Sequence, residues 1–266
     1  MNLRAEGRPL RVGHKGAAAL EPENTLRSLE RAVELGCDLV EFDVLDLDDG
    51  TLVLAHSDDL LEVSHGAARG RVGQLGLAEL RRVAPELPTF DEALELLGRA
   101  GGVGLHVDLK WHGYEAAAAG AIRRHGLLGQ TVVSSFSAHS LRTLAAAEPD
   151  LARAYTYPFD RLGVSHRRLL APANAAALIG LRRTLPLRIE RMLDRACASA
   201  AMLHYSVVSR AVVERAHAHG SAVFAWTVDD ETALERVLVV GVDGVITNDP
   251  RILAGMSGPS GTDGIA

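Results

Sequence analysis

The sequence predicts an α/β fold, a (β/α)8 TIM barrel. Short apolar segments alternate with helical patterns eight times over about 250 residues, which is the usual length of this fold. Hydrophobic residues make up 47% of the chain and aromatic residues only 4%, so the core has to be aliphatic. The alternative, an open doubly wound sheet, requires a glycine-rich phosphate fingerprint after the first strand, and the segment from Gly13 to Gly16 lacks that spacing.

The first part of the chain reads as a strand–helix–strand unit, which implies parallel strands. Its expected elements are a strand over 10–14, a helix from 24 or 25 to about 35, an apolar strand from 39, a hairpin turn at 48–50 and a returning strand over 51–55. Asn24 or Thr25 is a suitable N-cap for the helix, and Gly36 is a suitable residue to end it.

The later elements continue the alternation to the end of the chain. Further strands are expected over 103–110, 131–136, 152–155, 201–204, 222–226 and 244–246, and helices over 77–83, 89–97, 114–125, 140–147, 210–219 and 232–239. The region 161–200 is rich in Arg and Ala, is broken by Pro172 and Pro186, and reads as one or two helices. No linker suggests a second domain, so residues 1–266 are expected to form one domain with a core over about 10–254.

Charge and composition exclude several classes of protein. A net charge of -6 argues against non-specific nucleic-acid binding, which needs a basic surface. Cys37 and Cys197 are the only cysteines, too few for a disulfide framework. The N-terminus has no apolar stretch typical of a signal peptide, and no later run is long enough to span a bilayer. We therefore expect a cytoplasmic protein with a small-molecule substrate; its oligomeric state is not predicted.

The strand that begins at Leu39 carries two acids. Glu41 and Asp43 are two positions apart, so both carboxylates leave the same face of the strand. Two like charges on a buried strand repel each other and lose solvation, and a divalent cation removes both costs. Carboxylate oxygens suit Mg²⁺, Ca²⁺ or Mn²⁺. Solvated acids at a strand end are an equally good interpretation of this strand alone.

The ends of the predicted strands favour the metal interpretation. In such barrels the active site forms at the C-terminal ends of the strands. The polar residues expected there are His14 and Lys15, Glu41 and Asp43, His56, Asp108 and Lys110, Ser134, His204, Trp226, Asn248 and Asp249. Glu41, Asp43 and Asp108 can hold one divalent ion, while Lys15 and Lys110 attract an anion, for which phosphate is the best fit. His14 and His56 then supply the base and the acid for hydrolysis of a phosphodiester.

These residues occur in an order that resembles the glycerophosphodiester phosphodiesterase family, part of the phospholipase C-like phosphodiesterase superfamily. The motifs are the His14-Lys-Gly segment, Pro22-Glu-Asn-Thr25, Glu41-Phe-Asp43, His56, Asp108-Leu-Lys110, Trp226-Thr-Val and the segment from Asp243 to Pro250. The resemblance covers the chain from Val12 to Pro250. It implies a barrel with a small insertion after strand two, over about 57–87, and a metal-dependent hydrolase that releases glycerol 3-phosphate and an alcohol.

The resemblance also implies a role for each matching residue. His14 and His56 would be the acid–base pair, Glu41, Asp43 and Asp108 the ligands of one divalent cation, and Lys15 and Lys110 the phosphate-binding cations. Trp226 would stack on the glycerol or alcohol, although a half-buried barrel residue is nearly as good an interpretation. Two interpretations of Glu23 stay open: it reaches the site, or, as the preferred interpretation, it lies in the first turn of the helix. His106 is a weaker site candidate.

Two positions depart from the family pattern. The family usually has arginine at the position of Lys15 and glutamate at the position of Asp108. Lysine keeps the positive charge but cannot form the bidentate hydrogen bonds that arginine makes to phosphate. The shorter aspartate would draw the metal toward strand three or admit a water. Two alternatives therefore stay open: a lysophospholipid phosphodiesterase of the same superfamily, and a barrel that binds a phosphorylated ligand without turning it over.

Overall fold

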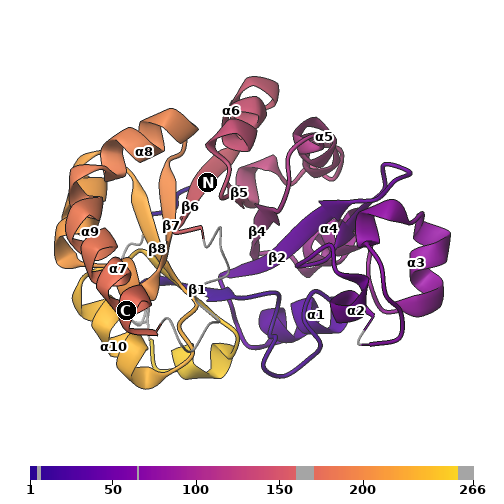
Figure 1. The fold of residues 1–266 in the computed structure, drawn as a ribbon, viewed down its shortest axis with the longest axis horizontal. Helices are drawn as coiled ribbons and strands as arrows, with labels where there is room; N and C mark the ends of the chain where they lie inside the picture. The colour runs from indigo at the N-terminus through magenta and orange to yellow at the C-terminus, as the bar shows by residue number, and fades with distance from the viewer. Residues whose placement is uncertain (5–6, 65, 160–170, 257–266) are drawn as a thin grey trace, which may run out of the picture.

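Eight parallel strands close into a barrel in the computed structural model, which describes residues 1–4, 7–64, 66–159 and 171–256, without the side chains of 171–176. The barrel strands are β1 (Leu10–Gly13), β2 (Leu39–Asp46), β4 (Gly104–Leu109), β5 (Thr131–Ser135), β6 (Ala152–Tyr157), β7 (Ala200–His204), β8 (Ala222–Trp226) and β9 (Gly244–Thr247). Each pairs with its neighbour in chain order, and β1 pairs with both β2 and β9, which closes the sheet (Figure 1). The predicted TIM barrel is confirmed.

Helices cover the outside of the barrel (Figure 1). They are α1 (Leu26–Glu34), α4 (Phe90–Ala100), α5 (Glu115–Arg124), α6 (Ala138–Ala147), α8 (Ile189–Ala196), α9 (Arg210–Ala218) and α10 (Glu231–Val239), with α7 (Ala171–Thr184) preceding α8 and short 3-10 turns η2 (Leu128–Gln130), η5 (Leu185–Leu187), η6 (Tyr205–Val207) and η7 (Pro250–Leu253). The region predicted as one or two helices thus contains two, α7 and α8, while residues 161–170 lie outside the described part.

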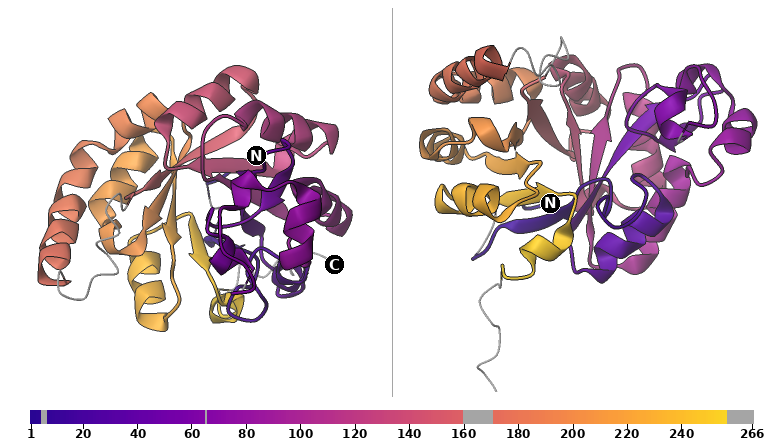
Figure 2. Two further views of the ribbon diagram at one scale, coloured as in Figure 1. Left: turned by 45° about the vertical axis from the view of Figure 1, so that its right-hand side comes forward. Right: turned by 60° about the horizontal axis from the view of Figure 1, so that its bottom comes forward.

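A small insertion follows β2, as the resemblance implied. The chain returns as β3 (Leu52–Leu54), antiparallel to β2, and continues through α2 (Leu60–Val63), η1 (Val72–Gln74) and α3 (Leu77–Val83). It packs around a hydrophobic cluster of its own, which includes Leu60, Val72 and Leu80. The insertion lies beside β2, across the barrel from α8, α9 and α10 (Figures 1 and 2).

Local sequence signals account for the helix boundaries near the site. Thr25 is the N-cap of α1, because its side chain accepts a hydrogen bond from the backbone N–H of Ser28. Gly36 follows the helix with a φ of 73°, a left-handed conformation that glycine adopts without steric cost. Thr89 and Glu92 form a capping box at the start of α4.

Alternation along β2 places the two acids where the sequence predicts. Val40, Phe42 and Val44 are fully buried in the layer between the sheet and the helices. Glu41 and Asp43 therefore point to the opposite side, toward the barrel interior. The lower part of that interior is filled by apolar side chains, among them Val12, Val132, Met202, Phe224 and Ile246. The acids lie in register with the next strand, since Asp43 is the direct partner of Asp108.

No helix in the described part of the chain has both the length and the apolar character needed to cross a bilayer.

Candidate active site

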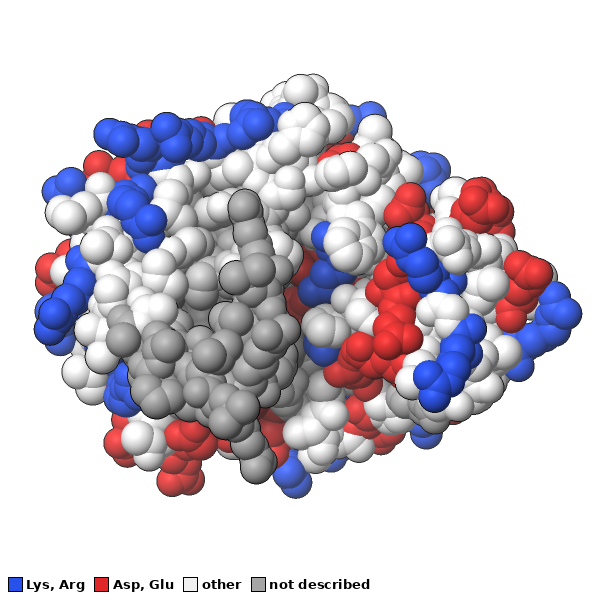
Figure 3. Space-filling model, in the orientation of Figure 1, with Lys and Arg blue, Asp and Glu red and all other residues white. Residues whose placement is uncertain are grey.

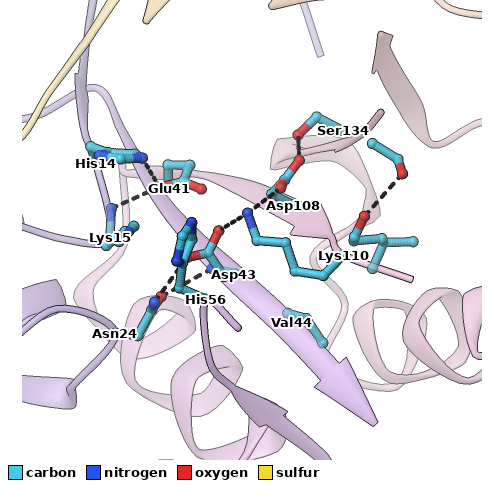
Figure 4. Close-up of polar contacts among 12 residues, drawn as sticks. His14, Lys15, Asn24, Glu41, Asp43, Val44, His56, Asp108, Lys110 and Ser134 are labelled. Carbon is cyan, nitrogen blue, oxygen red and sulfur yellow. Dashed lines mark hydrogen bonds and ion pairs between the residues drawn. The ribbon is translucent and has the colours of Figure 1, made fainter. Parts of the chain in front are cut away.

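The predicted site residues meet at the C-terminal ends of β1, β2 and β4. His14 and Lys15 directly follow β1, Glu41 and Asp43 lie within β2, and Lys110 directly follows β4. Figure 4 shows their side chains converging on one small volume, and in Figure 3 a hollow on this face contains basic and acidic side chains together. The closed barrel therefore brings together residues that are up to 96 positions apart, from His14 after the first strand to Lys110 after the third parallel strand.

His14 is held by the last strand segment of the barrel. Its backbone N–H donates to the carbonyl oxygen of Thr247 at 2.8 Å, and its Nδ1 lies 2.7 Å from Oδ1 of Asn248. The Asn248 side-chain amide donates to Asp229 Oδ2 at 2.7 Å, so Oδ1 is the atom that faces the imidazole. Because an amide oxygen only accepts, Nδ1 of His14 carries the proton, and Nε2 is left as an acceptor, 3.9 Å from Glu41 Oε2.

The environment of His14 favours the neutral imidazole. Burial is the largest cause that lowers its pKa, and the nearby positive charge of Lys15 acts in the same direction. These effects outweigh the negative charge of Asp43 and the hydrogen bond that His14 donates to Asn248, which both raise the pKa. A neutral histidine with a free Nε2 can accept a proton at neutral pH.

Glu41 is a buried carboxylate with little compensation. Its Oε2 accepts the backbone N–H of Lys15 at 2.7 Å, an arrangement that needs Lys15 in a left-handed conformation with a φ of 51°. Burial, and then the negative charge of Asp43, raise the pKa of Glu41 well above its usual range. A divalent cation would offset both causes, since it supplies the positive charge that desolvation and Asp43 make favourable.

Asp43 is fixed from two sides. Asn24, also left-handed with a φ of 58°, donates from Nδ2 to Asp43 Oδ2 at 2.9 Å and accepts the Asp43 backbone N–H at 3.0 Å. Oδ1 is buried and makes no hydrogen bond among the described residues, but Nζ of Lys110 approaches it at 2.5 Å. Burial is the largest single influence and raises the pKa of Asp43, but the positive charges around it, first that of Lys110, together outweigh burial and lower the pKa overall.

Asp108 is oriented by a serine and a histidine inside the barrel. Ser134 Oγ donates to Asp108 Oδ1 at 2.5 Å, and Nε2 of His106 lies 2.8 Å from the same Oγ. Since the hydroxyl proton goes to Asp108, His106 must donate from Nε2. Burial lowers the pKa of His106 to about 4, so this ring stays neutral. His106 therefore positions Asp108 through Ser134.

His56 lies on the insertion side of the site. It follows β3, its side chain is 44% exposed, and its Nδ1 is 3.2 Å from Glu62 Oε1 of α2. Ser57 Oγ donates to the other oxygen of Glu62 at 2.8 Å. His56 also lines a cavity of about 550 Å³ between the start of α1 and the insertion. In Figure 4 its ring stands beside Asp43, and its charge lowers the pKa of that carboxyl.

Glu23, His56 and Glu62 form a second group of possible metal ligands. One ligand atom from each lies within 4.8 Å of the others. Among the described residues, this is the group of three His, Cys, Asp or Glu side chains that meets this distance. Glu23 is already bound by the Lys15 ammonium, at 2.8 Å from its Oε2. The predicted set of Glu41, Asp43 and Asp108 stays a prediction, with better burial than this exposed group.

The family of the chain follows from its sequence match. The profile of the Glycerophosphoryl diester phosphodiesterase family matches residues 14–252, which include every predicted site residue. The chain belongs to this family. The predicted class of enzyme, a phosphoric diester hydrolase, is confirmed.

Relatives and solved structures of this family match nearly the whole chain. The glycerophosphodiester phosphodiesterase of Caldanaerobacter subterraneus subsp. tengcongensis is 28% identical over 258 residues, which cover 91% of this chain and 95% of that protein. A phosphodiesterase structure from Oleispira antarctica, in complex with the product sn-glycerol-3-phosphate, matches with a TM-score of 0.71 at 26% identity. The match covers 92% of this chain and 94% of the Oleispira chain. The Thermotoga maritima glycerophosphodiester phosphodiesterase shares the fold, with a TM-score of 0.72 at 19% identity, over 95% of this chain and all of that one (100%).

Aromatic side chains gather at the C-terminal end of β8. Trp226, at the end of β8, contacts the rings of Phe136 and His204 with centroids 5.9 and 5.3 Å away. Its Nε1 is buried and has no acceptor among the described residues. A buried N–H of this kind usually has a partner, and a substrate hydroxyl can supply one. The predicted stacking role of Trp226 remains a prediction.

Sequence reasoning gave the wrong preferred place to Glu23 and missed the site roles of Asn24 and Asp229. Glu23 lies before the N-cap of α1, so it is not a first-turn residue as interpreted; it pairs with Lys15 instead. Asn24 does not cap the helix but holds Asp43, and Asp229 holds Asn248. The signal for Glu23 and Asn24 was the family segment Pro22-Glu-Asn-Thr25, whereas nothing local indicated Asp229.

Proposed function

We propose that this chain hydrolyses glycerophosphodiesters to glycerol 3-phosphate and an alcohol, with one divalent cation held by Glu41, Asp43 and Asp108. The observation that carries the proposal is the state of His14, a neutral imidazole whose free Nε2 faces the buried carboxylates. A relative bound to its product sn-glycerol-3-phosphate supports the choice of substrate class.

The donor set fits a hard divalent cation. Glu41 is a desolvated carboxylate beside a second one, which is costly unless positive charge is supplied. Oδ1 of Asp43 is buried, and among the described residues the ammonium of Lys110 contacts it at 2.5 Å, so this oxygen already holds a cation. All the donors are carboxylate oxygens, which suit Mg²⁺, Ca²⁺ or Mn²⁺. When bound, such an ion supplies Lewis acidity toward a phosphoryl oxygen.

The residues of the chain then perform the proton transfers. His14 accepts a proton at Nε2 from the attacking hydroxyl. If water attacks, glycerol 3-phosphate forms directly; if the substrate's own 2-hydroxyl attacks, a cyclic phosphate forms first, and water then opens it to a glycerol phosphate. His56, on the other side of the site, donates a proton to the oxygen of the departing alcohol. Lys15 and Lys110 offset the charge of the phosphate, and Trp226 offers a flat apolar surface to the glycerol or the alcohol.

Release of glycerol 3-phosphate from glycerophosphoethanolamine tests the proposal. We expect activity with Mg²⁺, Ca²⁺ or Mn²⁺ that is lost with chelator, and loss of turnover in His14→Ala and His56→Ala. His125→Ala is the matched control, because His125 is bound to Asp91 on the outer surface. Activity that survives chelation would contradict the metal role, and activity that survives His14→Ala would contradict the proposed base.

A lysophospholipid substrate is the second candidate, and the cavity beside His56 favours keeping it. Part of its wall is apolar, formed by Val63, Val83 and Leu87 of the insertion, while Glu62 and Glu86 are acidic. An acyl chain needs such an apolar surface, although the acids limit its extent. Turnover of a lysophospholipid relative to a water-soluble diester decides between the two; we expect the soluble diester to be the better substrate.

A further inference from the structure

Lysine is used in this chain at two positions only. Lys15 and Lys110 are the only lysines among 266 residues, and both lie in the site. Their ammonium groups have different partners. Lys15 Nζ is 2.8 Å from Glu23 Oε2, outside the predicted metal ligands, whereas Lys110 Nζ is 2.5 Å from Asp43 Oδ1 and 2.7 Å from Asp108 Oδ2.

The position of the Lys110 ammonium is defined by its surroundings. Its backbone N–H donates to the hydroxyl of Tyr114, which itself donates to the carbonyl oxygen of Val44 on β2. The side chain then reaches back between β2 and β4, where 16% of it is exposed and the Asp43 side chain is fully buried. Figure 4 shows the amine pointing at both carboxylates.

The other oxygen of each carboxylate already has a partner. Asp43 Oδ2 accepts the side-chain amide of Asn24, and Asp108 Oδ1 accepts the hydroxyl of Ser134. The oxygens that remain for a metal ion are therefore Asp43 Oδ1 and Asp108 Oδ2, the two that Lys110 contacts. A divalent cation bound to these two oxygens would have to share them with Nζ of Lys110, which contacts both at 2.5 and 2.7 Å, and two cations repel strongly at such separations in a buried site.

We infer that Lys110 is an internal counter-cation, which competes with the divalent metal ion for Asp43 and Asp108 and is released toward the substrate phosphate when the metal binds. The inference rests on the proposed function, because it takes these carboxylates as the metal ligands. It makes Lys110 a positioning residue that links the metal site to the phosphate site. Metal entry and phosphate binding then favour each other, because each needs the ammonium to leave the carboxylates.

Calorimetric titration with Mn²⁺ tests the competition directly. Lys110→Met removes the competing charge and keeps an unbranched side chain, so we expect it to bind Mn²⁺ about tenfold or more tightly than the wild type, on the scale expected for one nearby charge. Lys15→Met is the matched control. It removes an equal charge from the same mouth but frees Glu23, and we expect its dissociation constant to stay within about threefold of the wild type.

Each outcome of the titration has a defined meaning. If Lys110→Met binds Mn²⁺ no more tightly than the wild type, the competition is wrong while the metal site itself stands. If neither protein binds Mn²⁺, both this inference and the metal role in the proposed function are overturned. If the wild type binds the metal and hydrolyses glycerophosphodiesters, but Lys110→Met and Lys15→Met bind Mn²⁺ equally well, the inference alone is overturned and the proposed function stands.

A measurement on the wild type keeps the test independent of how the variants fold. Protein labelled with ¹⁵N-lysine has two side-chain ammonium signals, which the two Met variants, or either one alone, assign. Saturating Mg²⁺ should shift or broaden the Lys110 signal, because its ammonium leaves two carboxylates and exchanges protons with water faster. The Lys15 signal should change less. A Lys110 signal unchanged at saturating Mg²⁺ would overturn the inference.

Discussion

The two histidines of the site are supported very differently. His14 belongs to the barrel: its backbone is bound to β9, and its ring is held through Asn248 to Asp229. His56 belongs to the insertion side, is 44% exposed, and has a single carboxylate partner, Glu62, on a four-residue helix. The closed sheet thus fixes one imidazole in a single tautomer, whereas the insertion leaves the other accessible to water and to protons.

This difference suits the proposed roles of His14 as the base and His56 as the acid. A base needs its free nitrogen fixed against the nucleophile, which the network around His14 provides. An acid has to regain a proton in each cycle, and the exposure of His56 makes that possible. We therefore expect changes around His14 to damage the chemistry more than equivalent changes around His56.

The largest effect is expected from the imidazoles themselves. His14→Ala should lower kcat by about 10²- to 10⁴-fold, the usual contribution of general acid–base catalysis, and binding of glycerol 3-phosphate should be nearly unchanged. Steady-state kinetics together with calorimetry measures both. A loss of binding comparable to the loss of turnover would instead make His14 a binding residue.

A smaller loss should follow when the support of His14 is removed. Asn248→Ala leaves the ring in place but frees its tautomer, so we expect kcat to fall by about 10- to 100-fold with little change in KM. Ser206→Ala is the control, because Ser206 contacts the ring of another rim histidine, His204, in the same way. Equal effects of the two changes would contradict a special role for Asn248.

The corresponding change on the insertion side should lower kcat by less. Glu62→Gln keeps a side-chain acceptor near His56 and removes one charge from a site that is about half exposed, where screening is strong. We expect kcat to fall by less than about tenfold, and the metal affinity to stay unchanged if Glu41, Asp43 and Asp108 are the ligands. A large loss of metal affinity would favour the group of Glu23, His56 and Glu62 instead.

The smallest effects are expected from two helix N-cap variants, which should have similar effects on stability but different effects on the site. Thr25→Ala removes the N-cap of α1 and Ser209→Ala that of α9, and each should lower the free energy of unfolding by about 1 kcal/mol. Only Thr25 is adjacent to Asn24, which holds Asp43. Thr25→Ala should therefore also weaken Mn²⁺ binding, by about twofold to fivefold in a calorimetric titration. Equal metal affinities in the two variants would show that the cap does not reach the site.

Much of this molecule was predictable from local sequence because the responsible physics is local. Alternation along β2 was enough to put Glu41 and Asp43 on one face and Val40, Phe42 and Val44 on the other, since strand side chains alternate. The Thr25 cap and the turn at Gly36 follow from side-chain and backbone preferences within one helix. The barrel followed from the number and order of such elements.

The tertiary structure alone decided which side chain holds which. His14 and Asn248 are 234 residues apart and meet because β1 pairs with β9. Lys110 faces Asp43 because β4 lies beside β2 in a particular register, and Lys15 turns to Glu23 rather than to the metal ligands. Residue types and spacing specify what chemistry is possible, but hydrogen bonds between distant strands form only when the sheet closes, so closure selects the partners and the protonation states.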